Sequence, residues 1–422
     1  MLGSFKKAIF RALCLCCVLI GGGGLMAKPN PEELFNLGML SYDKQDFSKA
    51  RKYFEKACEL KDGGGCFNLG RLYYYGEGVE KDFKKAFALF EKACDLNNSG
   101  GCGTLGMLYK FGQGVEKNLT KAAYFYSKAC DLDNGSGCNN LGDLYQNGEG
   151  IEKNLTKAAQ FYSKACDLDN GSGCSGLGFL YGSGEGVKQD SKKAVALYEK
   201  SCDLNNGLGC FNAGISYEYG RGVENNSEKA TQFYSKACDL NNNKGCFNLG
   251  ALYQNGQGVE KDLIKVAYFY TKACDLKDGS GCFNLGDLYL EKDSKKAVAL
   301  FEKSCDLNIS RGCGALGVLY YNGQGVEKDL IKVAYFYTKA CDLKDGSGCF
   351  NLGDLYLEKD SKKAVALFEK SCDLNISRGC GALGVLYYNG QGVEKNLTKA
   401  AQYISKACKL GDQKACEVLK EK

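Results

Sequence analysis

Cysteine dominates the chemistry that this sequence could perform, because it occurs 25 times in 422 residues whereas histidine is absent. Three cysteines, Cys14, Cys16 and Cys17, lie in an apolar N-terminal stretch. The other 22 form eleven pairs, and the two members of each pair are eight positions apart. The pairs are Cys58 with Cys66, Cys94 with Cys102, Cys130 with Cys138, Cys166 with Cys174, Cys202 with Cys210, Cys238 with Cys246, Cys274 with Cys282, Cys305 with Cys313, Cys341 with Cys349, Cys372 with Cys380 and Cys408 with Cys416. Such a set can form disulfides, hold zinc or act as redox-active thiols.

The zinc and redox alternatives fit this pattern less well than disulfides do. Structural zinc needs clustered Cys or His ligands, but the chain has no His and no C-x-x-C beyond Cys14-x-x-Cys17. Free redox-active thiols would leave an odd or unpaired cysteine, whereas the count beyond the N-terminal stretch is even. We therefore expect eleven disulfides between nearest neighbours, no metal and no other cofactor.

Beyond residues 1–27, serine chemistry has one candidate, Ser41-x-x-Lys44, which has the spacing of the nucleophile and lysine of serine β-lactamases. The S-D-N and K-T-G sequences that accompany this motif are absent. The absence of histidine also excludes a Ser-His-Asp triad and a His-ligated zinc site. We therefore interpret Ser41 and Lys44 as solvated residues at a helix end, and no catalytic residue is predicted.

The cysteine pairs mark an internal repeat, and such a repeat decides the fold. Their first members recur every 36 residues as far as Cys274, and then at intervals of 31, 36, 31 and 36. Both short intervals lack the Gly-x-Gly segment that the full repeats contain. Residues 255–328 recur identically as 322–395, which indicates a duplication of one long and one short repeat.

Each repeat predicts two helices. The first, helix A, runs from Cys66 to Gly76 in one copy, with Leu69, Leu72 and Tyr73 as an apolar stripe. Gly70 recurs at the same position of other repeats and predicts a helix crossing too close for a side chain. Helix B follows and begins at an Asp or Asn, whose side chain can cap the first amides. These cap residues are Asp46, Asp82, Asn118, Asn154, Asp190, Asn226, Asp262, Asp293, Asp329, Asp360 and Asn396.

Each cysteine pair joins the end of one helix B to the start of the next helix A, across a glycine-containing turn such as residues 97–101. Leu34 replaces the cysteine in the first helix A, which has no earlier helix B to join. The pattern predicts an all-α solenoid of disulfide-linked helix pairs. We expect a single array over residues 28–422, made of eleven repeats and a short C-terminal capping helix.

Residues 1–27 are predicted to be a signal peptide, with Lys6, Lys7 and Arg11 before a short apolar stretch. A lipoprotein anchor at Cys16 or Cys17 is a second interpretation, although Leu15 is bulkier than the usual residue. Without the signal peptide the chain has 52 basic and 50 acidic side chains. This balance gives no reason to expect nucleic acid as a partner, and no later segment predicts a membrane span. We expect a secreted or periplasmic protein.

The pattern L-G-x-L-Y-x-x-G-x-G-V-x-x-D/N-x-x-K-A, as at residues 69–86, resembles the Sel-like repeat, a relative of the tetratricopeptide repeat. With a cysteine pair in each repeat and a leader, the chain from about residue 31 to 422 resembles the secreted Helicobacter cysteine-rich protein family. This resemblance implies a right-handed α/α superhelix. It also implies either weak β-lactamase or penicillin-binding activity, with β-lactams or cell-wall peptides as ligands, or a role in host interaction.

The second residue after the helix A cysteine is asparagine in six repeats, namely Asn68, Asn140, Asn212, Asn248, Asn284 and Asn351. In tetratricopeptide-like arrays helix A lines the concave face, where an asparagine can bond the backbone of a bound peptide. A hydrogen bond between neighbouring repeats explains the same residue equally well. Our leading hypothesis is a scaffold that binds a peptide or protein on the concave face. The alternatives are a weak β-lactamase and a structural protein of the cell envelope.

Overall fold

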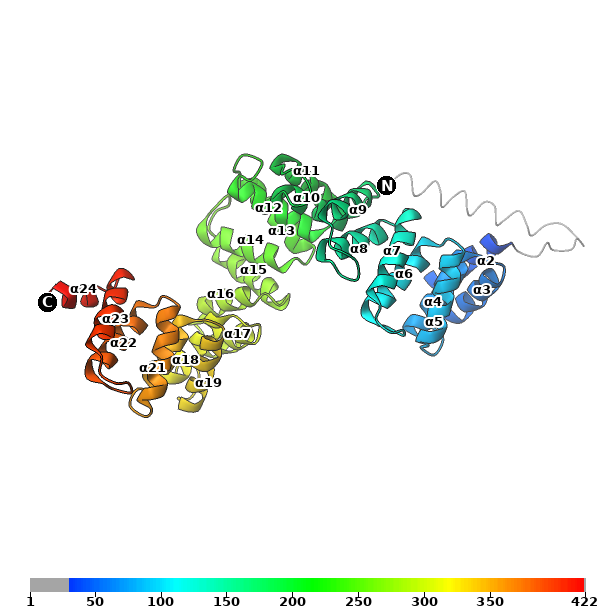
Figure 1. The fold of residues 1–422 in the computed structure, drawn as a ribbon. Coiled ribbons are helices and arrows are strands. Elements are labelled where there is room, and N and C mark those ends of the chain that lie inside the picture. Colours follow the sequence, from blue (N-terminus) through cyan, green and yellow to red (C-terminus); the bar gives the residue numbers. More distant parts are fainter. Residues whose placement is uncertain (1–29, 421–422) are drawn as a thin grey trace, which may run out of the picture. The chain divides into compact units, whose positions relative to one another are not determined.

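The computed structural model describes residues 30–420, so the predicted signal peptide at 1–27 lies outside the described residues. Within this range the chain forms 23 helices and no strand (Figure 1). They alternate as helix A and helix B of successive repeats. The all-helical solenoid expected from the sequence is thereby confirmed.

The described chain divides between Asn154 and Leu155 into two compact units. The first contains helices α2 (Pro31–Asp43), α3 (Phe47–Glu59), α4 (Gly63–Tyr75), α5 (Phe83–Asp95), α6 (Ser99–Phe111), α7 (Leu119–Asp131) and α8 (Gly135–Asn147). The even-numbered helices are helix A of their repeats, and the odd-numbered helices are helix B.

The second unit begins with a helix B and ends with a single short helix. It contains α9 (Leu155–Asp167), α10 (Gly171–Ser183), α11 (Ser191–Asp203), α12 (Gly207–Tyr219), α13 (Ser227–Asp239), α14 (Asn243–Asn255), α15 (Leu263–Asp275), α16 (Gly279–Tyr289), α17 (Ser294–Asp306), α18 (Ser310–Asn322), α19 (Leu330–Asp342), α20 (Gly346–Tyr356), α21 (Ser361–Asp373), α22 (Ser377–Asn389), α23 (Leu397–Lys409) and α24 (Gln413–Lys420). A single array over 28–422 stays a prediction.

The predicted caps start helix B. The Asp82 side chain accepts a hydrogen bond from the Lys85 amide at 2.9 Å at the start of α5. The caps of α3, α7, α11, α13, α15, α17, α19, α21 and α23 accept the equivalent bond. Each bond satisfies an amide that the helix itself leaves free.

Helix A begins earlier than predicted. We expected it to start at Cys66, but α4 starts at Gly63, because the Asp62 side chain caps it by accepting from the Gly65 amide. The connecting turn is correspondingly short, and its left-handed residue is Lys61 rather than a glycine. Gly65 lies inside the helix, where a Cβ would approach the Cβ of Ala57 to 2.6 Å.

The core of each repeat lies between its two helices. Leu69, Leu72 and Tyr73 of α4 are buried, as is Phe90 of α5. A Cβ at Gly70 would lie 2.8 Å from the Phe90 ring. The close crossing predicted from this glycine is therefore confirmed.

Within each of the two units, each helix packs mainly on the helix before it and the helix after it. In addition, several consecutive A helices touch each other within each unit, as α4 touches α6 and α10 touches α12. Because consecutive A helices contact each other more than consecutive B helices do, helix A lies on the inner side of the local curve.

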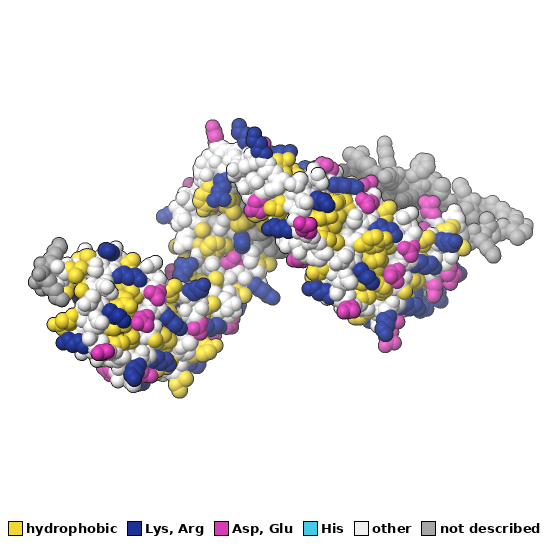
Figure 2. Space-filling view, viewed as in Figure 1, with side chains coloured by type: hydrophobic (Ala, Val, Ile, Leu, Met, Phe, Trp, Pro, Cys, Tyr) yellow, Lys and Arg dark blue, Asp and Glu magenta, His cyan; other side chains and the backbone are white. Residues whose placement is uncertain are grey.

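The surface carries lysine, arginine and acidic side chains mixed together on the visible face (Figure 2). None of the helices in residues 30–420 has both the length and the apolar character of a membrane span.

Candidate functional site

The structure places each of the eleven cysteine pairs in a disulfide between residues eight apart. The Cα atoms of Cys202 and Cys210 are 4.4 Å apart, and both side chains are fully buried. Each disulfide joins the last turn of one helix B to the first turn of the next helix A. The other bridges join Cys58 to Cys66, Cys94 to Cys102, Cys130 to Cys138, Cys166 to Cys174, Cys238 to Cys246, Cys274 to Cys282, Cys305 to Cys313, Cys341 to Cys349, Cys372 to Cys380 and Cys408 to Cys416.

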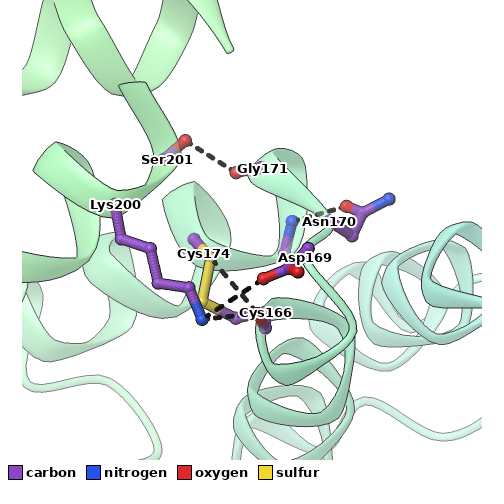
Figure 3. Close-up of a disulfide and its surroundings, with 8 residues drawn as sticks. Cys166, Asp169, Asn170, Gly171, Cys174, Lys200 and Ser201 are labelled. Carbon is purple, nitrogen blue, oxygen red and sulfur yellow. Dashed lines mark hydrogen bonds and ion pairs between the residues drawn. A yellow bond between two sulfur atoms is a disulfide. The ribbon is translucent and has the colours of Figure 1, made fainter. Parts of the chain in front are cut away.

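The junction at Cys166 and Cys174 shows how a third helix is held there (Figure 3). The Lys200 ammonium of α11 donates to the Cys166 carbonyl at 2.8 Å and lies 3.9 Å from the Asp169 carboxylate. The neighbouring Ser201 hydroxyl donates to the Gly171 carbonyl at 2.6 Å. These contacts link α9, α10 and α11, so the junction has a structural role.

The Ser41-x-x-Lys44 motif does not form a nucleophile and base. The Ser41 hydroxyl is buried and donates to the Leu37 carbonyl of its own helix at 2.9 Å, while Lys44 is exposed. Ser41 is therefore not solvated as the sequence suggested. Within residues 30–420, moreover, no three His, Cys, Asp or Glu side chains gather as a metal site would need.

The six predicted asparagines are all half-buried, but their surroundings differ. Asn68 donates to the Gly64 carbonyl of its own helix at 3.0 Å. Asn248 and Asn284 hydrogen-bond the hydroxyls of Tyr234 and Tyr270, which lie on the preceding helix B. For these two residues the structure shows the inter-repeat bond that the sequence left open.

The remaining three, Asn140, Asn212 and Asn351, make no side-chain hydrogen bond with any residue in the range 30–420. They are therefore the members of the predicted set whose amides are available to a ligand.

The tyrosines of helix B have a second partner, the residue eight positions after the helix A cysteine of the same repeat. The Tyr234 hydroxyl donates to Glu218 at 2.5 Å, and the Tyr270 hydroxyl donates to Gln254 at 2.7 Å. Burial, followed by the bond to Glu218, raises the pKa of Tyr234, and burial raises the pKa of Tyr270. These side chains thus form a polar link between consecutive repeats.

The link is interrupted between α10, α11 and α12, where a groove of about 770 Å³ opens. Gly182 stands at the position of Glu218 and Gln254, and Tyr198 stands at the position of Tyr234. The groove is lined by Gly182 and Tyr198 and by Asn212, Phe179 and Arg221, among others. Of the six predicted asparagines, Asn212 is thus placed in a groove. The sequence carried no signal for it, because the residue at the position of Gly182 varies between repeats, as Tyr74, Lys110 and Leu290 show.

Other apolar side chains are exposed near the C-terminal end of helix A. Tyr75, Phe111 and Tyr219 occupy the ninth position after the cysteine, and each is about 60% exposed.

The profile of the Sel1 repeat matches ten segments of the chain. They are residues 64–98, 104–134, 135–170, 171–206, 207–242, 243–278, 279–309, 310–345, 346–376 and 377–412. The first helix pair instead matches the tetratricopeptide repeat over residues 31–63.

Two proteins of Helicobacter pylori strain J99 are similar to part of the chain. HcpC is 59% identical over 81 residues, which are 19% of this chain and 27% of HcpC. "Beta-lactamase HcpA" is 53% identical over 81 residues, which are 19% of this chain and 32% of HcpA. The chain therefore matches only about a third or less of the length of these relatives.

Two solved structures share the fold over longer stretches. The protective antigen c5321 of uropathogenic Escherichia coli is 27% identical with a TM-score of 0.65, covering 86% of this chain and 80% of that chain. A Sel1 repeat protein from Oxalobacter formigenes is 25% identical with a TM-score of 0.53, covering 57% of this chain and 96% of that chain. With ten Sel1 segments, eleven cysteine pairs and these relatives, the chain belongs to the Sel1 repeat family and is homologous to the cysteine-rich proteins of Helicobacter.

Proposed function

We propose that this protein is an exported scaffold that binds a peptide or protein partner on its helix A side. Sel1 repeats form scaffolds for protein–protein interaction, and in this chain one groove can be named as the place where a partner would bind. The observation that carries the proposal is the groove between α10 and α12, in which the amide of Asn212 has no partner among residues 30–420.

The exported location is part of this proposal and is supported by the disulfides. Eleven disulfides in one chain are typical of an oxidising compartment, because cytosolic thiols are kept reduced. The homology to Helicobacter cysteine-rich proteins supports the same location. We therefore propose that the chain acts in the periplasm or outside the cell, where host or envelope proteins are the available partners.

Site-specific photo-crosslinking tests the binding face. A photoreactive residue at Ser183, which lines the groove, should crosslink a partner captured from envelope and host-surface fractions. The same residue at Lys192, an exposed position of α11 outside the groove, is the matched control. A partner that crosslinks through Lys192 and not through Ser183 would contradict the proposal that binding occurs on the helix A side.

Asn212→Ala complements this test, because it removes one free amide. We expect it to weaken capture of that partner about tenfold, which corresponds to ~1.4 kcal/mol. Asn68→Ala is the matched variant at an asparagine that bonds its own helix. Equal affinity of wild type and Asn212→Ala would remove Asn212 from the site.

β-Lactam hydrolysis is a second candidate function, favoured by the 53% identity to a protein named Beta-lactamase HcpA. The Ser41 hydroxyl is buried against its own helix, so this motif does not supply the nucleophile. A chromogenic cephalosporin assay on the pure oxidised protein tests this candidate: turnover above buffer would support it, and the absence of turnover would remove it.

A further inference from the structure

The groove between α10, α11 and α12 lies where a contact that the next two repeats make is absent. At the corresponding position of other repeats, Glu218 and Gln254 reach the hydroxyl of the helix B tyrosine. Gly182 cannot do so, and the Tyr198 hydroxyl makes no hydrogen bond to any residue in the range 30–420. Tyr198 is half-buried, whereas Tyr234 and Tyr270 are almost completely buried.

Packing does not require glycine at position 182. A Cβ there would lie 3.7 Å from both the Ala194 Cβ and the Tyr198 hydroxyl, which is ordinary van der Waals contact. Gly178 of the same helix is different, because its Cβ would lie 2.7 Å from the Tyr198 ring. Glycine also weakens a helical turn relative to alanine. Gly182 therefore keeps the groove open without serving the fold.

The groove presents hydrogen-bond donors that lack acceptors. The Tyr198 hydroxyl, the Asn212 amide and the Arg221 guanidinium all line it. Arg221 is the only charged side chain in the lining, and it forms no ion pair within residues 30–420. The guanidinium acts on the Tyr198 hydroxyl electrostatically, since it opposes the rise that burial causes in the pKa of Tyr198. Phe179 and Ile215 add an apolar wall to the groove.

These features together select for a negatively charged, planar acceptor beside an apolar surface. An arginine fork bonds a carboxylate through two N–H groups, and such charge-assisted bonds are stronger than neutral ones. The neighbouring amide of Asn212 can bond a peptide backbone. A volume of about 770 Å³ accommodates a few residues rather than a single ion.

We propose that this groove binds an acidic side chain of an extended peptide, with the carboxylate at Arg221 and Tyr198 and the adjacent backbone at Asn212. The inference rests on the proposed function and names its ligand chemistry. The positive charge is specific to one repeat, because the equivalent residues are glutamine or glutamate. They are Glu77, Gln113, Glu149, Glu185, Gln257, Gln324 and Gln391.

The test is a selection of random dodecapeptides, displayed with their C-termini blocked, on the full oxidised chain. We expect the bound peptides to be enriched in Asp and Glu. A synthetic amidated peptide from this selection should bind at least tenfold more weakly to Arg221→Gln and to Gly182→Gln. Both substitutions introduce the residue that other repeats carry there, so the fold should tolerate them.

Glu185→Gln is the matched control, because Glu185 occupies the position of Arg221 one repeat earlier and does not line the groove. Replacing the acidic residue of the peptide by its amide should weaken binding to the wild type but should cause little further loss with Arg221→Gln.

The outcomes separate the inference from the proposed function. Selected peptides without acidic residues, or peptides insensitive to Arg221→Gln, would overturn the carboxylate site while leaving the scaffold intact. Recovery of binding only with a free C-terminal carboxylate would also overturn the side-chain proposal. Failure to select any peptide would overturn the groove as a peptide site, and the Ser183 crosslinking experiment would then decide the proposed function.

Discussion

Asn212 and Asn248 occupy the same position in consecutive repeats but have different surroundings. The Asn248 amide hydrogen-bonds the buried Tyr234 hydroxyl, whereas Asn212 lines an open groove. Asn248→Ala should therefore cost about 1 kcal/mol of stability, because the Tyr234 hydroxyl loses one of its two partners and keeps Glu218. Asn212→Ala should cost less than about 0.5 kcal/mol. Denaturant unfolding of both variants measures the difference, and equal losses would show that the two asparagines share one role.

Buried tyrosines predict a loss of stability at high pH. Burial, followed by the Asp143 charge, raises the pKa of Tyr126 from its usual 10 to about 12. Between these values the unfolded chain loses the phenolic proton first, so the unfolded state is favoured as pH rises. Unfolding midpoints in urea should fall from pH 10 towards pH 12, and less steeply in Tyr126→Phe. Tyr124→Phe, which removes an exposed hydroxyl, is the control; an identical pH profile for Tyr126→Phe and wild type would contradict the assignment.

The sequence predicted residues whose role depends on their own chain segment. Asp82 caps the helix that follows it, and Cys202 pairs with a cysteine eight positions away. The asparagines could not be assigned in the same way. Their role depends on the tyrosine of the preceding helix B and on the residue of the helix A before it that can bond this tyrosine. Gly182 illustrates this, since its effect is visible only once Tyr198 and Asn212 are seen beside it.

At the scale of the element, glycines decide how closely helices A and B approach. A Cβ at Gly106 of α6 would overlap the Tyr126 ring of α7, whereas a Cβ at Gly103 would meet nothing nearer than 3.9 Å. Gly106→Ala should destabilise the protein by about 1–3 kcal/mol through overpacking. Gly103→Ala should stabilise it by up to about 1 kcal/mol, because alanine favours a helix. Thermal unfolding compares them, and a stable Gly106→Ala variant would refute the close crossing.

Each disulfide stabilises only the junction between one helix B and the next helix A. The bridge between Cys202 and Cys210 closes a loop whose ends are eight positions apart, and its loss should cost about 2.5 kcal/mol in the chain-entropy account. Alanine should replace both cysteines, because their positions are fully buried. Hydrogen exchange should accelerate in α11 and α12 while remote helices of the same unit, such as α20 and α21, stay protected. A uniform acceleration would indicate one cooperative unit.

Helix type and order followed from the sequence, whereas the start of helix A did not. The sequence GGGC reads as a flexible turn, yet Gly63 to Gly65 are helical because Asp62 caps them and because Ala57 leaves no room for a side chain at Gly65. The contact of Gly65 with the preceding helix B is tertiary, and no local pattern reveals it.

At the scale of the molecule, helices contact mainly their neighbours in the chain and, among A helices, those of the adjacent repeats, so repeats can be gained without rearranging the rest. The duplicated segments 255–328 and 322–395 show this directly. In both copies a buried serine of helix B donates to the first carbonyl of helix A at 2.8 Å, from Ser304 to Gly279 and from Ser371 to Gly346. The same local sequence thus gives the same local structure in two places.

This argument predicts the effect of removing one copy. Deletion of residues 322–388 joins Tyr321 to Asn389, which reproduces the natural sequence on both sides of the junction. Helix α23 then follows α18, whose sequence from Ser310 to Asn322 is identical to that of α22, so every helix in the shortened chain keeps a neighbour that it already has. We expect nine disulfides, unchanged hydrogen-exchange protection in α10–α14 and unchanged affinity for peptides selected on the groove.

The matched control is a deletion of the same length that removes residues 330–396. It begins at the first residue of α19, directly after the loop that precedes this helix B. Because the repetition ends at residue 395, this deletion places Asp329 before Leu397 and changes the cap of α23 from Asn396 to an aspartate. It should fold as well, since Asp and Asn cap equally. Loss of protection in α10–α14 in either deletion would show that the array is stabilised by coupling beyond nearest neighbours, and the one-dimensional account of this solenoid would be wrong.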